Sequence, residues 1–297
     1  MRLIVLLMMF FGFSMAYAWD NHVLSIEDLD RAISINPNAA DAYFDRGILF
    51  EKKEDYAKAI ADFTETIRIK SDDVGAYEAR ANAYAAQGHF DLSINDYNKI
   101  IELTPHDPTA FYNRGLAYSN QGNEAQAIAD FSSAIAMNPD YAESYHNRGL
   151  SWIRVGRLTE ALSDLNKSIE LNPALSEAYY NRGIVEDNFG RSIDAINDFS
   201  KAIQLNPEYA QSYINRGNVY VEQDDLAQAR FDYTKAIEIN PKLAESYNNR
   251  AIVYYQLKEF SQAQEDIKKA IDLGYKVDTN LQKEMFQAQE ESIGQKQ

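Results

Sequence analysis

Two rows of opposite charge recur along the chain at a spacing of 34 residues. The basic row consists of seven arginines: Arg46, Arg80, Arg114, Arg148, Arg182, Arg216 and Arg250. The acidic row lies sixteen residues further on and has an eighth member near the N-terminus: Asp28, Asp62, Asp96, Asp130, Asp164, Asp198, Asp232 and Asp266. A planar guanidinium can meet a carboxylate with two hydrogen bonds while its stem packs along apolar surface. The arginines are therefore either presented to an anionic ligand or part of a structural ladder that ties helices together within or between repeats, and we favour the ladder.

A row of amides directly precedes five of these arginines. Its members are Asn113, Asn147, Asn181, Asn215 and Asn249. A primary amide offers donors and an acceptor together, so a regular row can bind the main chain of an extended peptide without demanding a particular sequence. The alternative is that each Asn forms hydrogen bonds locally. Asp45 and Ala79 stand at the same place in the first two repeats, which confines the row to the last five.

No spacing in the sequence predicts catalysis. The chain has no Cys, which excludes a thiol nucleophile and a disulfide framework. Its four histidines, His22, His89, His106 and His146, lack the spacing of metal ligands. A glycine-rich phosphate loop and a nucleophile elbow are both absent from the sequence. We therefore expect a protein that is not an enzyme and that holds no cofactor and no metal.

The elements that position these rows are helical hairpins. Within Ser176 to Tyr209, apolar residues recur at helical spacing over the first 14 positions and again over positions 17 to 30. Gly190 provides a left-handed residue that ends the first helix, and Asn206 with Pro207 ends the second. Seven such units begin at Ala40, Val74, Pro108, Ala142, Ser176, Ala210 and Ala244, after a half repeat at 19–39. Because a lone hairpin cannot bury its apolar faces, the units must stack into an all-α solenoid.

The unit resembles the tetratricopeptide repeat over residues 40–277. The shared features are an aromatic residue at position 4, Gly or Ala at position 8, mostly an aromatic residue at 11, Ala at 20 and Pro at 32. The resemblance implies a right-handed superhelical solenoid of antiparallel helix pairs. Glu186 at position 11, Ser93 at 20 and Ser71 at 32 depart from the pattern and weaken single units. Residues 278–297 are predicted to form a C-terminal capping helix and tail, because a solenoid must cover its last apolar face.

The resemblance also implies a binding groove. In tetratricopeptide arrays, positions 2, 5, 6, 9, 12 and 13 of each unit line the concave face. The Asn row would lie there, and it is similar to the asparagine ladder of protein O-GlcNAc transferase, which grips the backbone of an extended peptide. The further groove residues that we expect to contact a guest are Tyr112, His146, Tyr180, Asn218 and Tyr255.

The charge of these groove positions indicates the kind of guest. Across the seven units they hold nine acidic residues and two basic ones, Lys52 and Arg154. The tetratricopeptide domains that bind chaperone C-termini clamp a carboxylate with Lys and Arg, and the absence of Lys at position 5 excludes that clamp here. We therefore predict an acidic groove and a neutral or basic peptide or protein partner.

The first eighteen residues do not follow the repeat. Met1 and Arg2 are followed by a mostly apolar run at 3–15 and by the small-x-small site at 16–18. This pattern predicts a secretory signal peptide cleaved before Trp19, and the alternative is the first helix of an eighth repeat. The run is shorter than the roughly 20 apolar residues that span a bilayer, so we expect no permanent membrane span. Export to the bacterial periplasm is predicted, with secretion as the alternative.

The overall charge excludes one class of partner. A net charge of -16 argues against binding to nucleic acid and to an anionic membrane surface. We predict a non-catalytic protein–protein interaction scaffold of the cell envelope, which binds an extended peptide or a partner helix in its groove. Two alternatives stay open: a structural subunit of an envelope assembly, such as secretion or polysaccharide export, or a homo-oligomer that associates through its ends.

Overall fold

The computed structural model describes residues 24–294. The predicted signal peptide, the first residues of the half repeat and the last three residues of the tail lie outside this range. Within it the chain forms sixteen α-helices and no strand, which confirms the all-α prediction. The chain divides into two compact units, Met1–Pro139 and Asp140–Gln297, and each is described by itself.

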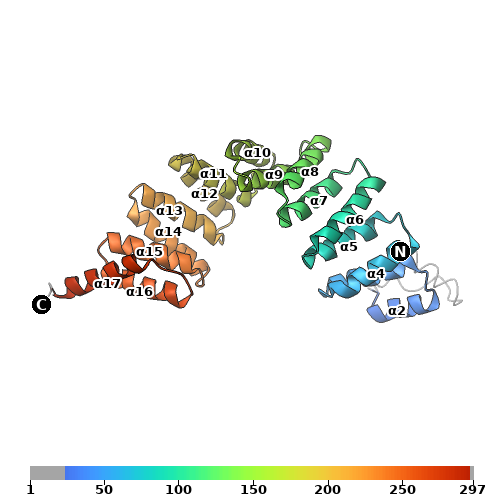
Figure 1. Cartoon of the computed structure of the whole chain (residues 1–297), viewed down its shortest axis with the longest axis horizontal. Helices are drawn as coiled ribbons and strands as arrows, with labels where there is room; N and C mark the ends of the chain where they lie inside the picture. The colour runs from blue at the N-terminus through green and yellow to red at the C-terminus, as the bar shows by residue number, and fades with distance from the viewer. Residues whose placement is uncertain (1–23, 295–297) are drawn as a thin grey trace, which may run out of the picture. The chain divides into compact units, whose positions relative to one another are not determined.

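The first unit begins with one single helix, after which helices come in pairs. Its helices are α2 (Ile26–Ile35), α3 (Ala40–Glu51), α4 (Tyr56–Ile69), α5 (Val74–Ala86), α6 (Phe90–Leu103), α7 (Pro108–Asn120) and α8 (Glu124–Met137). Each helix packs against the next one along the chain (Figure 1). α2 packs on α3 through the buried Leu29, and its last residue, Ile35, is 73% exposed.

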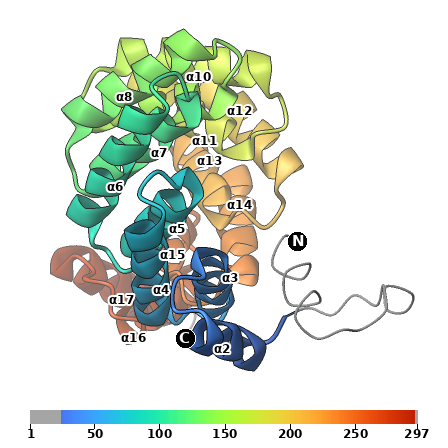
Figure 2. The same ribbon diagram turned by 90° about the vertical axis from the view of Figure 1, so that its right-hand side faces the viewer.

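The second unit contains four complete pairs and a final single helix. Its helices are α9 (Ala142–Arg154), α10 (Leu158–Leu171), α11 (Ser176–Asn188), α12 (Ser192–Leu205), α13 (Ala210–Glu222), α14 (Leu226–Ile239), α15 (Ala244–Gln256), α16 (Phe260–Asp272) and α17 (Thr279–Gly294). The first helices of neighbouring pairs also contact one another, from α9 through α11 and α13 to α15 (Figures 1 and 2). They therefore form one layer. We call the side of this layer that carries positions 2, 5, 6, 9, 12 and 13 of each repeat the first-helix face.

Backbone conformation explains where the first helix of each pair ends. Gly88, Gly122, Gly156 and Gly190 all have φ between 70° and 85°, the left-handed region that glycine adopts without steric cost. The units that lack this glycine still make the same turn, with Glu54, Asp224 and Lys258 at φ of 59° to 60°. The packing of the hairpin therefore imposes this turn. The left-handed conformation costs conformational energy wherever the residue carries a side chain.

The two helices of a pair come close at position 8, which is glycine in five repeats and alanine, Ala81 and Ala251, in the other two. A Cβ atom added to Gly183 would lie 2.7 Å from the ring of Phe199, and one on Gly47 would lie 2.6 Å from the ring of Phe63. Both rings are almost fully buried. In these two repeats the ring at position 24 therefore fills the space that a side chain at position 8 would take.

The last helix, α17, covers the apolar side of α16. Met285 is fully buried against Ala251, Ala263 and Ile267. The ammonium group of Lys268 lies 5.7 Å from the centre of the Phe286 ring, within the range of a cation–π contact. The end of the stack is thus shielded from water by a helix that lacks the repeat pattern.

Candidate functional site

Every arginine of the basic row pairs with the aspartate sixteen residues later. In all seven repeats Nε and Nη2 donate to the two carboxylate oxygens over 2.6 to 2.8 Å. The aspartate side chains are at most 8% exposed, and the arginine side chains between 14% and 23%. These bidentate pairs join the two helices of one hairpin.

A third donor of the same guanidinium reaches the preceding repeat. Nη1 donates over 2.6 to 3.1 Å to an oxygen at position 25 of that repeat, and the acceptors are Asp30, Thr64, Asn98, Asn166, Ser200 and Thr234. Aromatic rings flank the guanidinium, as in Arg250, which lies 5.8 Å from the Tyr247 ring and 5.6 Å from the Tyr254 ring. The arginines are thus used within the fold, an arrangement that fits the ladder and not the presentation of a basic row to a ligand.

Asp28, predicted as the eighth member of the acidic row, has a different role. Its carboxylate accepts from the backbone N–H and the hydroxyl of Ser25 in a capping box at the start of α2. The residue sixteen positions before it is Gly12 and not arginine. We therefore remove Asp28 from the ladder.

The Asn row is held by hydrogen bonds of two kinds. In Asn147 and Asn181 the side-chain amide donates to the backbone carbonyl four residues earlier, over 3.0 and 2.7 Å. Asn215 donates to the Tyr180 hydroxyl over 3.2 Å, and Asn249 donates to the side chain of Asn218 over 3.1 Å. The contacts of Asn215 and Asn249 reach the preceding repeat, so these two members of the row link neighbouring first helices to one another.

Two side-chain oxygens of the row stay open. The side-chain oxygens of Asn181 and Asn215 accept no hydrogen bond within residues 24–294. Both amide donors of Asn181 are occupied, whereas Asn215 uses one of its two. The group that both residues offer to a guest is therefore an acceptor for a main-chain N–H. Asn113 and Tyr112 belong to the first unit, and the four other asparagines of the row belong to the second.

His146 and Asn181 form the contact that is sensitive to protonation. The imidazole Nε2 lies 3.0 Å from Asn181 Nδ2, which also donates to the carbonyl of Glu177. This second bond fixes the amide orientation, so Nε2 must accept and the ring is neutral. Burial lowers the pKa of His146, although Glu177 and Glu143 oppose the shift.

Tyr209 was not predicted as a site residue. It lies in the loop before α13, and its ring centre is 4.7 Å from that of Tyr180. Burial raises the pKa of the Tyr209 hydroxyl to about 12. Its signal in the sequence is an aromatic residue at position 34, which the stacking of hairpins brings next to position 5. The predicted Tyr255 is half-buried against Phe260, with ring centres 5.7 Å apart.

The first-helix face of the second unit carries five carboxylates and one cation, Arg154. Its groove positions carry Glu143, Glu177, Asp187, Glu222 and Glu245. None of these five carboxylates forms an ion pair with another residue in the described part of the chain. Burial raises the pKa of Asp187, because a partly desolvated carboxylate loses hydration of its charged form.

No group of His, Asp or Glu within residues 24–294 has the arrangement of a metal site. The helices of the same residues include none that is long and apolar enough to cross a membrane.

Comparison with known protein families assigns the repeat. Sequence profiles described as "TPR repeat" match residues 81–122, 190–224 and 217–258, and profiles described as "Tetratricopeptide repeat" match 29–61, 108–141, 142–175 and 244–273. The chain belongs to the tetratricopeptide-repeat family. No match is found among curated protein sequences.

Solved tetratricopeptide structures have the same fold. A tetratricopeptide repeat protein from Parabacteroides merdae is 21% identical, with a TM-score of 0.63 over 84% of this chain and 98% of that one. YrrB, described as a TPR protein with an unusual peptide-binding site, is also 21% identical, with a TM-score of 0.52 over 63% of this chain and 97% of YrrB. A chain of the APC/C hetero-tetramer Cut9–Hcn1 gives 17% identity and a TM-score of 0.64 over 88% of this chain and 52% of that one. This tetratricopeptide chain thus has the fold of a protein–protein interaction scaffold.

Proposed function

We propose that this tetratricopeptide protein is a non-catalytic scaffold of the cell envelope, exported to the periplasm, that binds an extended neutral or basic segment of a partner on the first-helix face of its second unit. The observation that carries the proposal is the set of five carboxylates on that face without an ion pair. Unpaired charges of one sign select a partner of the opposite sign and speed its association.

The amide row supplies the second part of the recognition. The free oxygens of Asn181 and Asn215 lie one repeat apart and can accept main-chain N–H groups of an extended guest. Tyr180, whose ring packs tilted against that of Tyr209, offers an aromatic surface beside them. The structural similarity to YrrB, itself described as having a peptide-binding site, supports binding of a peptide.

The experiment is an affinity capture from envelope extract with the full chain, in which captured proteins are identified by mass spectrometry. The test variant neutralises the face with Glu177→Gln, Asp187→Asn and Glu245→Gln. A control variant carries Asp194→Asn, Glu265→Gln and Asp272→Asn, which remove the same charge from exposed positions on the second helices. Circular dichroism establishes that both variants are folded.

We expect a partner that the wild type and the control retain and that the test variant loses. The bound segment of that partner should be extended and neutral or basic, and added salt should weaken its binding. Equal capture by the test variant and the wild type would refute the proposal, as would a partner segment that is acidic.

A further inference from the structure

The sixth repeat breaks the pattern of the earlier ones at two neighbouring positions. Position 21 is a buried or half-buried Ile or Leu in the first five repeats: Ile60, Ile94, Ile128, Leu162 and Ile196. Position 22 is small or polar in the same repeats: Ala61, Asn95, Ala129, Ser163 and Asn197. In α14 these positions hold Arg230 and Phe231, and the Phe231 side chain is 52% exposed. The large apolar side chain has thus moved from the interior to the surface.

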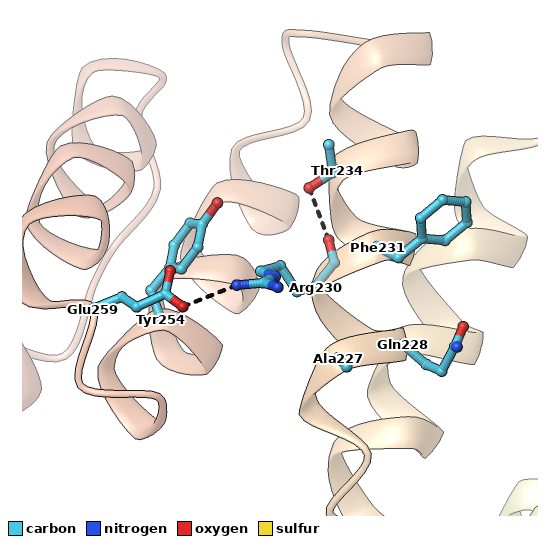
Figure 3. Close-up of a pocket in the computed structure, with 7 residues that line it drawn as sticks. All are labelled: Ala227, Gln228, Arg230, Phe231, Thr234, Tyr254 and Glu259. Carbon is cyan, nitrogen blue, oxygen red and sulfur yellow. Dashed lines mark hydrogen bonds and ion pairs between the residues drawn. The ribbon is translucent and has the colours of Figure 1, made fainter.

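An open depression lies where the apolar residue is missing. Its volume is about 670 Å³, and its lining consists of Ala227, Gln228, Arg230, Phe231, Thr234, Tyr254 and Glu259 (Figure 3). Arg230 extends from α14 towards Glu259, the residue before α16, and Nη1 donates to Oε1 over 2.9 Å. An ion pair therefore replaces apolar packing between these two repeats. Exceptions of this kind, which cost packing, concentrate at functional sites.

Several hydrogen-bonding groups of the depression have no partner in the described part of the chain. The guanidinium of Arg230 makes only the bond to Glu259, which leaves most of its N–H donors open. The Tyr254 hydroxyl also makes no hydrogen bond within residues 24–294. Phe231 projects from α14 on the other side from Arg230 (Figure 3). A ligand that lies across α14 would meet an exposed ring and open N–H donors together.

The charge of the depression indicates the class of ligand. Its lining holds one positive and one negative side chain, and these form a pair with each other. It is thus neutral on a chain of net charge -16. Because Arg230 and Glu259 neutralise each other, the depression offers no unpaired charge that would select a charged ligand. An uncharged ligand with carbonyl oxygens satisfies the open donors without adding a charge.

We propose that the outward surface of α14, comprising Arg230, Phe231 and the depression beside them, is a second docking surface, which takes an uncharged segment of a partner protein. A large apolar side chain of the segment packs on the Phe231 ring, and a main-chain or side-chain carbonyl accepts from Arg230. Phenylalanine and arginine are among the residue types that are enriched at protein interfaces. The scaffold then holds two different partners, one on this surface and one on the first-helix face.

The test variant is Arg230→Ile with Phe231→Asn, which gives the sixth repeat the residues of the fifth. Because these residues already occur in a folded repeat of the same chain, we expect the variant to be at least as stable as the wild type in thermal unfolding. A random-peptide display library is selected on the immobilised full chain, with excess soluble double variant as competitor. The surviving peptides are then synthesised, and their dissociation constants are measured by isothermal titration calorimetry.

We expect enriched peptides that are uncharged and contain a large apolar side chain. Their binding should weaken at least about tenfold with Phe231→Asn alone, and should not change with the Glu177→Gln, Asp187→Asn, Glu245→Gln variant. The second result separates this inference from the function proposed for the first-helix face. The proposal would be overturned if no peptide survived the competition or if charged peptides were enriched. It would also be overturned if Phe231→Asn left the dissociation constants unchanged.

Discussion

Replacing Asp198 by Ala removes one member of the arginine–aspartate ladder and leaves its partner in place. Arg182 loses two hydrogen bonds, of 2.7 and 2.6 Å, and keeps a third to Asn166 over 2.8 Å. The Asp198 side chain is 8% exposed, while 23% of the Arg182 side chain still reaches water. The hydrogen bonds to Asp198 raise the pKa of Arg182 in the wild type. The guanidinium keeps its charge in the variant as well, because the ordinary pKa of arginine lies far above neutral pH.

The size of the effect follows from this partial burial. Stranding a fully buried charge costs about 3 to 5 kcal/mol. An exposed ion pair contributes at most about 1 kcal/mol. Because water can solvate part of the stranded guanidinium, we expect Asp198→Ala to lower the free energy of unfolding by about 3 kcal/mol, at the lower end of the buried range.

The assay combines urea unfolding of the full chain with native-state hydrogen exchange. Repeat proteins can open locally, so exchange in α11 and α12 reports the loss in the affected repeat itself. Adding Arg182→Met to Asp198→Ala should recover much of the stability, since an apolar side chain leaves no charge unpaired. A loss below about 1 kcal/mol, or no recovery in the double variant, would show that the ladder is an ordinary surface pair.

Three further predictions concern packing and pH. The buried hydroxyl of Ser212 has no hydrogen-bond partner, and other repeats have a buried Ala at this position. Ser212→Ala should therefore raise the free energy of unfolding by about 1 kcal/mol in urea titration. A decrease would mean that the hydroxyl does form a hydrogen bond. Gly183→Ala should lower the free energy of unfolding by about 1 to 3 kcal/mol because the new Cβ meets the Phe199 ring at 2.7 Å. Gly149→Ala, with its nearest side-chain atom at 3.2 Å, should cost less, and equal losses would contradict the steric argument. Burial lowers the pKa of His146 below its ordinary 6.5. The contribution of the neutral ring to stability is therefore present above pH 6.5 and is lost as the pH falls through the lowered pKa. His146→Gln should flatten the dependence of the free energy of unfolding on pH below 6.5, and an unchanged dependence would refute this.

The repeat made the fold predictable from the sequence. In the fifth repeat the predicted helices at positions 1 to 14 and 17 to 30 correspond to α11, Ser176–Asn188, and α12, Ser192–Leu205. Gly190 has the left-handed φ of 70° that its position indicates. Such features depend on residues close together in the chain, where the pattern is informative.

Contacts between repeats were harder to predict. The third hydrogen bond of each arginine goes to Asp, Thr, Asn or Ser in different repeats, so no single residue type reveals it. The donors of the Asn row are bound by groups either four or more than 30 residues away, and the sequence does not distinguish these cases. The depression beside α14 follows from two departures from the repeat pattern, Arg230 and Phe231. Their effect depends on the residues of the next repeat that line the same depression, Tyr254 and Glu259.

The most direct test of the central claim is to locate the captured partner on the fifth repeat. A photo-cross-linking amino acid is placed at Asn188, an exposed groove position at the end of α11, or at Asn197, an exposed position on α12. Our account predicts a covalent adduct with the partner from position 188 and none from position 197. An adduct from position 197 alone would place this partner on the second helices and contradict the account.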